Sequence, residues 1–499
     1  MSLYLGIDLG TSGLKAVFVS PDGNVRGIGY GRCRIDIPQP GYAEQDPQAW
    51  YETMCRAVRE GLKQTGESAD QVKGISLSGH MHGTVLLDKE GALLHPAVLW
   101  CDQRTGEEKK WVSEHIGLAK LHAWVQNSVN SGFQCLTLLW FRNHEPEKFK
   151  RIAHVLLPGD YLRYRLTGEM LGERTGAAST LLFDHQKGDW SAELMEALQL
   201  KRSIFPDVKH APYDLAGTLT CQAAEALGLP CGIPVAFGGG DQPMAMLGNG
   251  LLDPKVASIT LGTAGQVCVP VYTLRTDPFL RTNTFSYVPE NAWYVMGATL
   301  NACLAYNWFL EKILHVTDYQ MLDEEAKRVK PGCGGLIFLP YLTGERTPHL
   351  DEKACGGFYN LQLSHGRGDM VRSILEGVAF SLLDAWHVIE EMGVDIDEFI
   401  ISGGGAKSPL WRQIVADVFD RPLKMNKNPE QAGLGAAICA MIACKEYASL
   451  KEACQATVRY DSLLTLPQKK EAAVYKQVFK QYVKAFQDNQ ELMHQSRGF

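Results

Sequence analysis

A single carboxylate follows a run of glycines in the segment Val235–Gln242, which reads Val-Ala-Phe-Gly-Gly-Gly-Asp-Gln. Apolar residues that run into glycines indicate the end of a strand, which is where α/β proteins form ligand sites. In that place Asp241 could accept the proton of an attacking hydroxyl group during phosphoryl transfer. Capping of a following helix would account for the same residue, so the local sequence leaves both roles open.

A second chemical signal is a motif that occurs twice, about half a chain apart. Ile7–Gly13 reads Ile-Asp-Leu-Gly-Thr-Ser-Gly and Ile259–Gly265 reads Ile-Thr-Leu-Gly-Thr-Ala-Gly, with five of seven positions identical. Each copy lies between two β-rich runs and predicts a β-hairpin. Backbone amides at a glycine turn suit phosphate oxygens, although one copy alone would indicate a plain turn. The matching pair predicts duplicated domains that face each other across a cleft and each lend a loop to one polyphosphate.

Asp8 lies in the first copy of this motif, directly before the glycine turn. A carboxylate beside a phosphate is unfavourable unless a cation lies between them, and Mg²⁺ typically binds through one or two carboxylates together with phosphates. The second copy has Thr260 at the equivalent position, so a metal is expected on one side only. A turn-capping aspartate is the alternative interpretation.

Two further clusters carry side chains that suit a sugar. His80 and His82 follow a predicted strand, and neutral imidazoles can both donate hydrogen bonds to hydroxyl groups and accept them. Their spacing would fit zinc, but no third ligand accompanies them. Trp100, Asp102 and Arg104 offer an aromatic face, a carboxylate and a guanidinium within five residues. A surface turn with an incidental ion pair is the simpler account of this second cluster.

The glycine-rich segment Gly403–Ser408 reads Gly-Gly-Gly-Ala-Lys-Ser. It follows an apolar run and precedes a predicted helix that starts near Pro409. Such a bend allows close approach of the backbone to a base or a ribose. An ordinary strand-to-helix turn accounts for the same residues.

Both helices and strands must position these residues. The apolar periodicity predicts helices over 47–62, 369–392 and 468–486 and strands over 74–77 and 399–402. Strands alternate with helices in both halves of the chain, which indicates an α/β protein. The repeat predicts an N-terminal domain over residues 1–250 and a C-terminal domain over residues 251–499 that ends in a helical tail.

Length and composition exclude several classes of protein. The chain has 499 residues, a net charge of −7 and 13 cysteines, none of them in a Cys-x-x-Cys pair. Its length exceeds the size at which one core usually stops growing, and it lacks the basic clusters of a nucleic-acid-binding protein. No apolar run reaches the roughly 20 residues of a membrane span, and the N-terminus does not look like a secretion signal. A reducing cytoplasm is therefore expected.

Taken together, these residues resemble the FGGY carbohydrate kinases, whose two domains share the fold of actin, hexokinase and the heat-shock ATPases. The stretches that carry the resemblance are Gly6–Gly13, Glu44–Pro47, Met81–Gly83, Leu99–Arg104, Leu156–Leu162, Gly238–Asp241, Phe338–Pro348, Glu376–Phe380 and Gly403–Ala406. The resemblance implies two duplicated, ribonuclease H-like domains that face a central cleft. It also implies transfer of the γ-phosphoryl group of ATP to the terminal hydroxyl of D-xylulose.

The resemblance further implies roles for individual residues. Asp241 is the base, and Asp8 supports Mg²⁺. The phosphate- and nucleotide-binding residues are Thr11, Ser12, Lys15, Gly262, Thr263, Gly404, Gly405 and Ala406. The residues of the sugar pocket are Met81, His82, Trp100, Asp102 and Arg104. The implied partners are ATP, Mg²⁺ and a small sugar that binds the N-terminal domain, with no nucleic acid and no membrane; a homodimer is left open.

Three departures from the family pattern concern substrate choice. His80 stands where Gln is common, and Thr137 stands where Lys is expected. The aspartate usual near residues 175–180 appears as Glu173 or is lost at Gly176. These departures leave the kinase interpretation intact and put the identity of the sugar in question.

Alternatives of several classes are left. A kinase of the same family could act on gluconate, ribulose or glycerol, although Leu9 stands where glycerol kinases usually have Gln. A chaperone-like ATPase would need a separate peptide-binding domain, which the chain lacks after residue 450. A catalytically silent sugar sensor would have no need of the retained Asp241.

Overall fold

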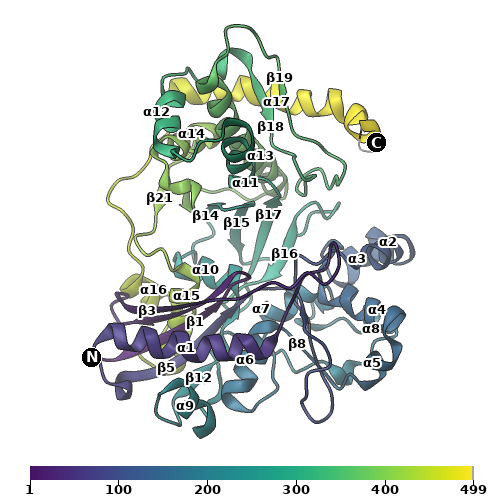
Figure 1. The fold of residues 1–499 in the computed structure, drawn as a ribbon, viewed down its shortest axis with the longest axis vertical. Coiled ribbons are helices and arrows are strands. Elements are labelled where there is room, and N and C mark those ends of the chain that lie inside the picture. Colours follow the sequence, from purple (N-terminus) through teal and green to yellow (C-terminus); the bar gives the residue numbers. More distant parts are fainter. Residues whose placement is uncertain (497–499) are drawn as a thin grey trace.

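The computed structural model describes residues 1–496, which form two lobes stacked along the long axis of the molecule (Figure 1). The N-terminal lobe is built on a seven-stranded mixed sheet. Its strands follow the order β11, β12, β5, β1, β2, β3, and β13 also pairs with β5. They are β1 (Leu3–Leu9), β2 (Gly13–Val19), β3 (Val25–Arg32), β5 (Val72–Gly79), β11 (Leu215–Thr218), β12 (Pro234–Ala236) and β13 (Gly239–Gly240).

The C-terminal lobe repeats this arrangement. Its six-stranded sheet has the order β16, β17, β15, β14, β20, β21. The strands are β14 (Val256–Leu261), β15 (Gly265–Val271), β16 (Asn283–Ser286), β17 (Trp293–Thr299), β20 (Glu398–Ser402) and β21 (Leu423–Met425). β1 pairs antiparallel with β2 and parallel with β5, and β14 pairs in the same way with β15 and β20. The predicted α/β duplication is therefore confirmed, and each glycine motif forms the turn of its hairpin.

Each sheet carries a long helix at the place that the periodicity predicts. These helices are α1 (Pro47–Thr65) and α13 (Arg367–Glu391). Asp46 caps α1 by accepting a hydrogen bond from the Gln48 amide at 2.9 Å, and Gly66 ends the helix with a φ of 69°. α1 packs closely on β3 because β3 carries glycines: a Cβ on Gly29 would lie 1.7 Å from the Ala57 carbonyl oxygen.

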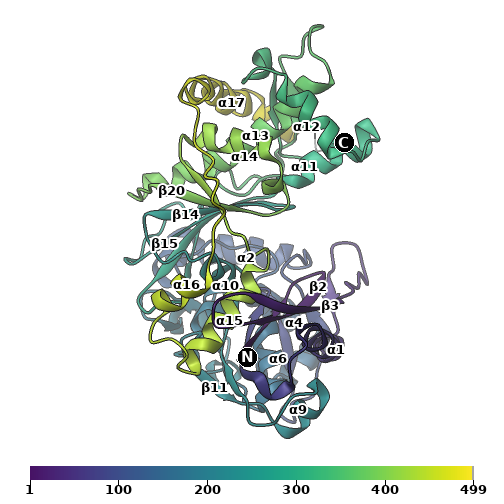
Figure 2. The same ribbon diagram turned by 90° about the vertical axis from the view of Figure 1, so that its left-hand side faces the viewer.

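Two helices, α10 (Asp241–Gly248) and α15 (Gln431–Ala443), pack against each other beside the N-terminal sheet. Small residues allow their contact, since a Cβ on Gly435 would lie 1.9 Å from the Met244 carbonyl oxygen. α15 also packs on the N-terminal sheet, where a Cβ on Gly6 would lie 1.9 Å from the Gly433 carbonyl oxygen. α15 and α16 (Leu450–Thr457) thus lie with the N-terminal lobe (Figures 1 and 2). Residues 431–457, which come late in the sequence, thus pack with the N-terminal lobe, and the division into two domains at residue 250 stays a prediction.

The predicted helical tail is α17 (Lys469–Ser496), which returns to the C-terminal lobe and packs there through Tyr475, Tyr482 and Phe486. The remaining helices of the N-terminal lobe are α2 (Gly106–His115), α3 (Gly117–Trp124), α4 (Gln134–His144), α5 (Pro146–Arg151), α6 (Pro158–Thr167), α7 (Arg174–Ala177), α8 (Ala192–Ala197) and α9 (Cys221–Leu227). Those of the C-terminal lobe are α11 (Cys303–Trp308), α12 (Tyr319–Lys327) and α14 (Pro409–Phe419). No helix in the described part of the chain is both long and apolar enough to cross a membrane.

Candidate functional site

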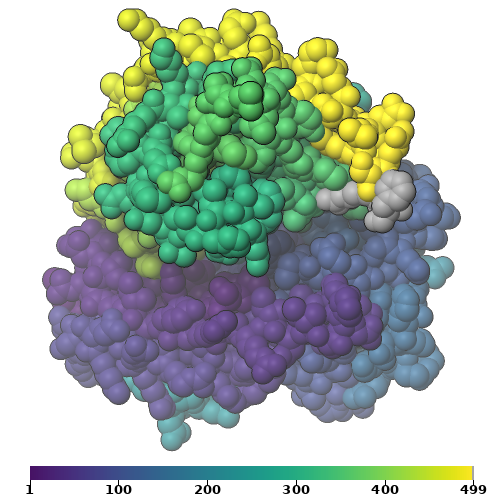
Figure 3. All heavy atoms as spheres, turned by 45° about the horizontal axis from the view of Figure 1, so that its top comes forward, coloured from purple at the N-terminus to yellow at the C-terminus, as the bar shows by residue number. Residues whose placement is uncertain are grey.

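The strand pairing of the N-terminal sheet brings Asp8 and Asp241 to the same edge. In β5, Ser78 lies opposite Asp8 on one side and opposite Gly239 on the other. The Ser78 hydroxyl donates a hydrogen bond to the Asp8 carboxylate at 2.8 Å. Asp241 directly follows Gly240 at the end of β13. Two acids that are far apart in the sequence therefore lie two strands apart, at the same edge of this sheet. Figure 3 shows a recess between the two lobes.

Asp241 is the first residue of α10, and Gly240 is the residue that caps this helix. The Asp241 carboxylate accepts a hydrogen bond from the Gln242 amide at 2.8 Å and is partly exposed. Burial and then the charge of Asp8 raise the pKa of Asp241 to about 7. Burial also raises the pKa of Asp8, while the Ser78 hydroxyl and Lys15 oppose that rise. The site thus disfavours two negative charges unless a cation joins them.

A buried network fixes the backbone just before Asp241. The Gly240 amide donates a hydrogen bond to the Thr175 hydroxyl at 3.2 Å. The Glu173 carboxylate accepts from the amides of Thr175, at 2.6 Å, and of Gly176. Burial, followed by the charge of Asp160, raises the pKa of Glu173 to about 7. Sequence reasoning noticed Glu173 and Gly176 only as departures from a pattern and missed Thr175, whose signal was its place at the start of a short helix.

The first glycine turn is held by residues from elsewhere in the N-terminal lobe. The Trp100 indole donates a hydrogen bond to the Thr11 hydroxyl at 2.8 Å, and the side-chain amide of Gln45 donates to the Thr11 backbone carbonyl at 2.8 Å. Ser12 is exposed at the tip of the turn. Lys15, predicted to bind phosphate, forms an ion pair with Glu430 at 2.6 Å in this structure.

The second glycine turn is hydrogen-bonded to the start of α11. The Gly262 carbonyl accepts from the Cys303 amide at 2.9 Å, and the Thr263 carbonyl accepts from the Ala302 amide at 3.0 Å. Thr263 itself is exposed. These two carbonyl groups are therefore hydrogen-bonded within the C-terminal lobe.

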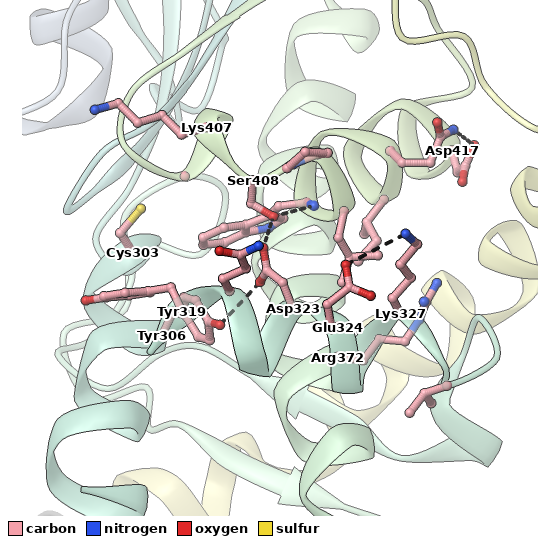
Figure 4. Close-up of a pocket in the computed structure, with 18 of the residues that line it drawn as sticks. Cys303, Tyr306, Tyr319, Asp323, Glu324, Lys327, Arg372, Lys407, Ser408 and Asp417 are labelled. Carbon is pink, nitrogen blue, oxygen red and sulfur yellow. Dashed lines mark hydrogen bonds and ion pairs between the residues drawn. The ribbon is translucent and has the colours of Figure 1, made fainter. Parts of the chain in front are cut away.

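A cavity of about 990 Å³ opens in the C-terminal lobe beside this turn. Its volume lies at the upper end of the range for small-molecule sites. Gly404 and Gly405 line it, as predicted for a nucleotide site, whereas Ala406 is buried behind them with 2% exposure. Figure 4 shows side chains from several helices that surround the cavity, among them Cys303, Tyr306, Tyr319, Asp323, Glu324, Lys327, Arg372, Lys407, Ser408 and Asp417.

The wall of this cavity was largely missed by sequence reasoning. The Asp323 carboxylate accepts from the Ser408 hydroxyl at 2.6 Å and from the Tyr306 hydroxyl at 3.5 Å. The rings of Tyr306 and Tyr319 meet edge to face with centroids 5.9 Å apart. The only available signal was the amphipathic pattern of 319–327, which does not reveal which side chains face a ligand.

The predicted sugar residues Met81 and His82 lie where the two lobes meet. The hydroxyl of Tyr294 on β17 donates to the Met81 sulfur at 3.6 Å. The His82 ring stacks on Phe133 with centroids 4.3 Å apart, and its Nδ1 lies 2.6 Å from the Ser179 carbonyl oxygen. Burial lowers the pKa of His82 to about 4, so the ring is neutral at pH 7. Nδ1 donates to the carbonyl, and Nε2 is left as an acceptor.

Asp102 and Arg104 were predicted to contact a sugar, and the structure pairs them with each other. The Arg104 guanidinium contacts Asp102 at 2.8 Å and Glu44 at 2.6 Å, and both Asp102 and the Arg104 side chain are at most 1% exposed. Asp102 also accepts from the Ala43 amide at 2.6 Å. This ion pair braces the segment that precedes α1, and of this cluster only Trp100 reaches the turn.

His80 is buried at 1% exposure, and neither of its ring nitrogens has a hydrogen-bond partner. Burial lowers its pKa to about 4. Across residues 1–496, no three side chains of His, Cys, Asp and Glu are grouped so that they could hold a metal ion by themselves.

Comparisons with known proteins match the whole length of this architecture. Residues 3–248 match the N-terminal domain of the FGGY family of carbohydrate kinases, and residues 257–444 match its C-terminal domain. The chain is 34% identical to a xylulose kinase of Lactococcus lactis over 99% of this chain and 98% of the relative. It is 34% identical to a xylulose kinase of Escherichia coli strain K12 over 90% of this chain and 92% of the relative.

Solved structures agree with this result. A xylulose kinase from Rhodospirillum rubrum superposes with a TM-score of 0.92 at 29% identity, and the match covers 99% of this chain and 100% of that one. A glycerol kinase from Plasmodium falciparum with ADP superposes with a TM-score of 0.88 at 21% identity, covering 97% of this chain and 98% of that one. The second likeness concerns the fold alone.

Proposed function

This chain belongs to the FGGY family of carbohydrate kinases, and we propose that it phosphorylates D-xylulose at its terminal hydroxyl with ATP as donor. The family resemblance drawn from the sequence motifs is thereby confirmed. The observation that carries the proposal is the placement of Asp241 and Asp8 at one edge of the gap, with a glycine turn from each lobe beside it. The relatives named xylulose kinase, which match nearly the whole chain, favour this acceptor.

Asp241 is the proposed general base. With a pKa raised to about 7, its carboxylate is a stronger proton acceptor than an ordinary aspartate, and about half of it is deprotonated at neutral pH. As the acceptor oxygen bonds to the γ-phosphorus, the bond from that phosphorus to the bridging oxygen of ADP breaks. The hydroxyl proton passes to the Asp241 carboxylate. The buried hydrogen bond from Gly240 to Thr175 holds this acid in place.

Asp8 is the proposed support for Mg²⁺. Carboxylate and hydroxyl oxygens from Asp8 and Ser78 suit this hard cation. Burial raises the pKa values of both acids, and the charge of Asp8 adds to the rise at Asp241, so a cation bound between them would favour their charged forms. When bound, Mg²⁺ supplies positive charge against the phosphate oxygens and lowers the repulsion between them and Asp8.

The two lobes divide the substrates in this proposal. The cavity beside Gly404 and Gly405 takes the nucleoside, and the turns around Thr11 and Thr263 face its phosphates. Met81, His82 and the N-terminal lobe take the sugar. Closure of the lobes excludes water, which would otherwise compete with the sugar for the γ-phosphoryl group.

A cytoplasmic location completes the proposal. All thirteen cysteines of the chain are free thiols, which supports a reducing compartment. ATP as the donor agrees with the same compartment. Two partners are sufficient for the reaction, a small sugar and Mg²⁺-ATP, and a homodimer is an open alternative to a monomer.

A panel of acceptors tests the proposed function. ADP release is measured with D-xylulose, D-ribulose, D-gluconate and glycerol, each with and without Mg²⁺. We expect the highest kcat/KM with D-xylulose and a product whose phosphorus is bonded to the C5 oxygen, as determined by NMR. A higher kcat/KM for any other acceptor would overturn the assignment of the sugar. ADP release that no acceptor stimulates would overturn the kinase function itself.

A further inference from the structure

A buried asparagine of the N-terminal lobe is hydrogen-bonded to the edge of the C-terminal sheet. Asn127 lies in the segment between α3 and α4 and is 1% exposed. β16 lies at one edge of the six-stranded sheet, so one side of its backbone has no neighbouring strand, and it reaches the N-terminal lobe there (Figure 1). Oδ1 of Asn127 accepts from the Thr284 amide at 3.0 Å, and its Nδ2 donates to the Thr284 carbonyl at 2.7 Å. The side-chain amide thus pairs with β16 as a neighbouring strand would.

Two further hydrogen bonds orient this amide. Oδ1 of Asn127 also accepts from the Asn283 side chain at 3.2 Å, and Nδ2 lies 3.1 Å from Nε2 of His185. Burial lowers the pKa of His185 to about 3, so its ring is neutral and Nε2 can accept a hydrogen bond. The oxygen of Asn127 therefore has two donors, and its NH₂ group has two acceptors. This position requires a side chain that both donates and accepts.

β16 carries one of two rings that pack against the predicted sugar residues. The ring of Phe285 lies 6.0 Å from the ring of His82. Phe285 is opposite Tyr294 of β17, and these two rings are 5.5 Å apart. The Tyr294 hydroxyl donates to the Met81 sulfur at 3.6 Å. Both rings are fully buried, so they support His82 and Met81 from the C-terminal lobe.

Contacts on either side of β16 strengthen this junction between the lobes. The Thr276 hydroxyl lies 3.1 Å from Nε2 of His122 in α3. The Arg174 guanidinium of α7 donates to the Val288 carbonyl at 2.7 Å. Residues 276–288 are thus attached to the N-terminal lobe, although β16 belongs to the C-terminal sheet.

We propose that Asn127 is a positioning residue for the sugar: its hydrogen bonds to β16 fix the two rings against which His82 and Met81 pack. The inference rests on the proposed function, in which His82 and Met81 bind the sugar. Asn127 acts through the rings and needs no contact with the substrate. Because the proposed nucleoside cavity lies elsewhere in the C-terminal lobe, loss of this contact should change sugar binding more than nucleotide binding.

The test replaces Asn127 with a side chain of the same size. In Asn127→Asp the new carboxylate accepts hydrogen bonds and has none to donate, so it repels the Thr284 carbonyl. The His185 ring can donate to the carboxylate by changing its tautomer, but the Thr284 carbonyl still loses its donor. We expect the KM for D-xylulose to rise about tenfold, the order expected when a buried carbonyl is left unpaired. The KM for ATP and kcat should change much less.

A pH series distinguishes positioning from a general loss of structure. Burial raises the pKa of a carboxyl group, and a protonated carboxyl regains one donor for the Thr284 carbonyl. The ratio of the KM for D-xylulose in Asn127→Asp to that in wild type should therefore decrease at least about threefold from pH 8 to pH 6. Titration of Asp241 affects both proteins alike and cancels in this ratio.

Asn127→Ala is the second variant. It removes the amide without adding a charge, so the KM for D-xylulose should rise and its ratio to wild type should not depend on pH. ADP binding to both variants, followed by calorimetry, should be as in wild type and shows that each is folded.

Asn426→Asp is the matched control. Asn426 is 7% exposed, its Nδ2 donates to the Gly248 carbonyl at 2.8 Å, and its Oδ1 accepts from the Asn428 amide at 2.9 Å. The same substitution is thus made at another buried asparagine that holds a backbone carbonyl, here at the end of α10 and not at β16. The KM for D-xylulose in Asn426→Asp should stay as in wild type at every pH.

The outcomes separate this inference from the proposed function. If wild type phosphorylates D-xylulose and both Asn127 variants keep its KM, or raise the KM values for sugar and ATP equally, the role of Asn127 is overturned and the proposed function stands. A KM ratio for Asn127→Asp that does not change with pH also overturns that role. If wild type phosphorylates another acceptor and not D-xylulose, the proposed acceptor alone fails, and the same KM comparison with that acceptor decides the role of Asn127.

Discussion

The two glycine hairpins have the same architecture and different electrostatics. In the N-terminal lobe, Asp8 lies opposite Ser78 of the neighbouring parallel strand and accepts a hydrogen bond from its hydroxyl. In the C-terminal lobe, Thr260 lies opposite Ser402 in the same register, and their hydroxyl oxygens are 3.3 Å apart. The two hairpins thus share the same strand pairing, but the first carries a carboxylate and the second a neutral hydroxyl at the same position.

The helices that follow the two sheets show the same contrast. Asp241 begins α10 and has no basic partner, so its pKa is raised. Glu430 caps the start of α15, and Lys15 neutralises it at 2.6 Å. Asp8 and Asp241 both belong to the N-terminal lobe, and Thr260 takes the position of Asp8 in the C-terminal lobe. In the proposed mechanism, the metal and the proton acceptor are therefore on the N-terminal side of the polyphosphate.

The largest effect should come from replacing the unpaired acid. Asp241→Asn keeps the shape of the side chain and removes the proton acceptor, so we expect kcat to fall at least about 100-fold while ADP binding persists. Glu430→Gln, the change at the start of the corresponding helix, should lower kcat less than about fivefold, because it removes a partly exposed ion pair. Steady-state kinetics measures both. Turnover of Asp241→Asn above a tenth of wild type would exclude this residue as the base.

A smaller effect on activity is expected from replacing Asp8 and Thr260, the equivalent residues of the two hairpins. Asp8→Asn should raise the Mg²⁺ concentration for half-maximal activity about tenfold, the low end for a group that orients a metal through its outer shell. Thr260→Val removes the corresponding hydroxyl in the other lobe and should leave the Mg²⁺ titration as in wild type. Equal Mg²⁺ requirements in wild type and Asp8→Asn would contradict the contrast between the two turns.

The smallest effect to measure is the pH dependence. Because the pKa of Asp241 is raised to about 7, the fraction of its active, deprotonated form rises with pH through 7. We expect kcat/KM to fall about tenfold per unit as the pH drops below that value. Glu173 has a similarly raised pKa, so Glu173→Gln is the control and should keep this acid limb. If the decrease of kcat/KM at low pH disappeared in Glu173→Gln, the titrating acid would be Glu173 and not Asp241.

Several parts of the site could be predicted from the sequence because their signals are local. The hairpins around Gly10 and Gly262 follow from apolar runs that flank a glycine turn. The glycines Gly238–Gly240 indicate the end of a strand, and the acid that follows them, Asp241, lies at the same sheet edge as Asp8. Sequence reasoning could not tell a base from a helix cap at Asp241, because that choice depends on Gly240 taking the capping position.

Other parts depend on contacts between distant residues. The Thr175 hydroxyl holds the Gly240 amide across 65 positions of sequence, and no local pattern announces such a bond. The second copy of the motif, at Ile259–Gly265, predicts a domain boundary near residue 250. The packing of α15 on the N-terminal sheet depends on Gly6 of β1, where a Cβ would meet the Gly433 carbonyl of α15, and no local pattern predicts that contact.

The sequence by itself determined the two hairpins, the helices on each sheet and the presence of an acid in only one of the turns, because strand alternation, glycine and helical periodicity act over a few residues. The tertiary structure decided which charged side chains have an ion-pair partner. Asp102 and Arg104 neutralise each other in the core, while Asp241 and Arg346 have no ion-pair partner among the described residues. Whether a charge is paired depends on side chains that packing brings together from both lobes, and that information is not local.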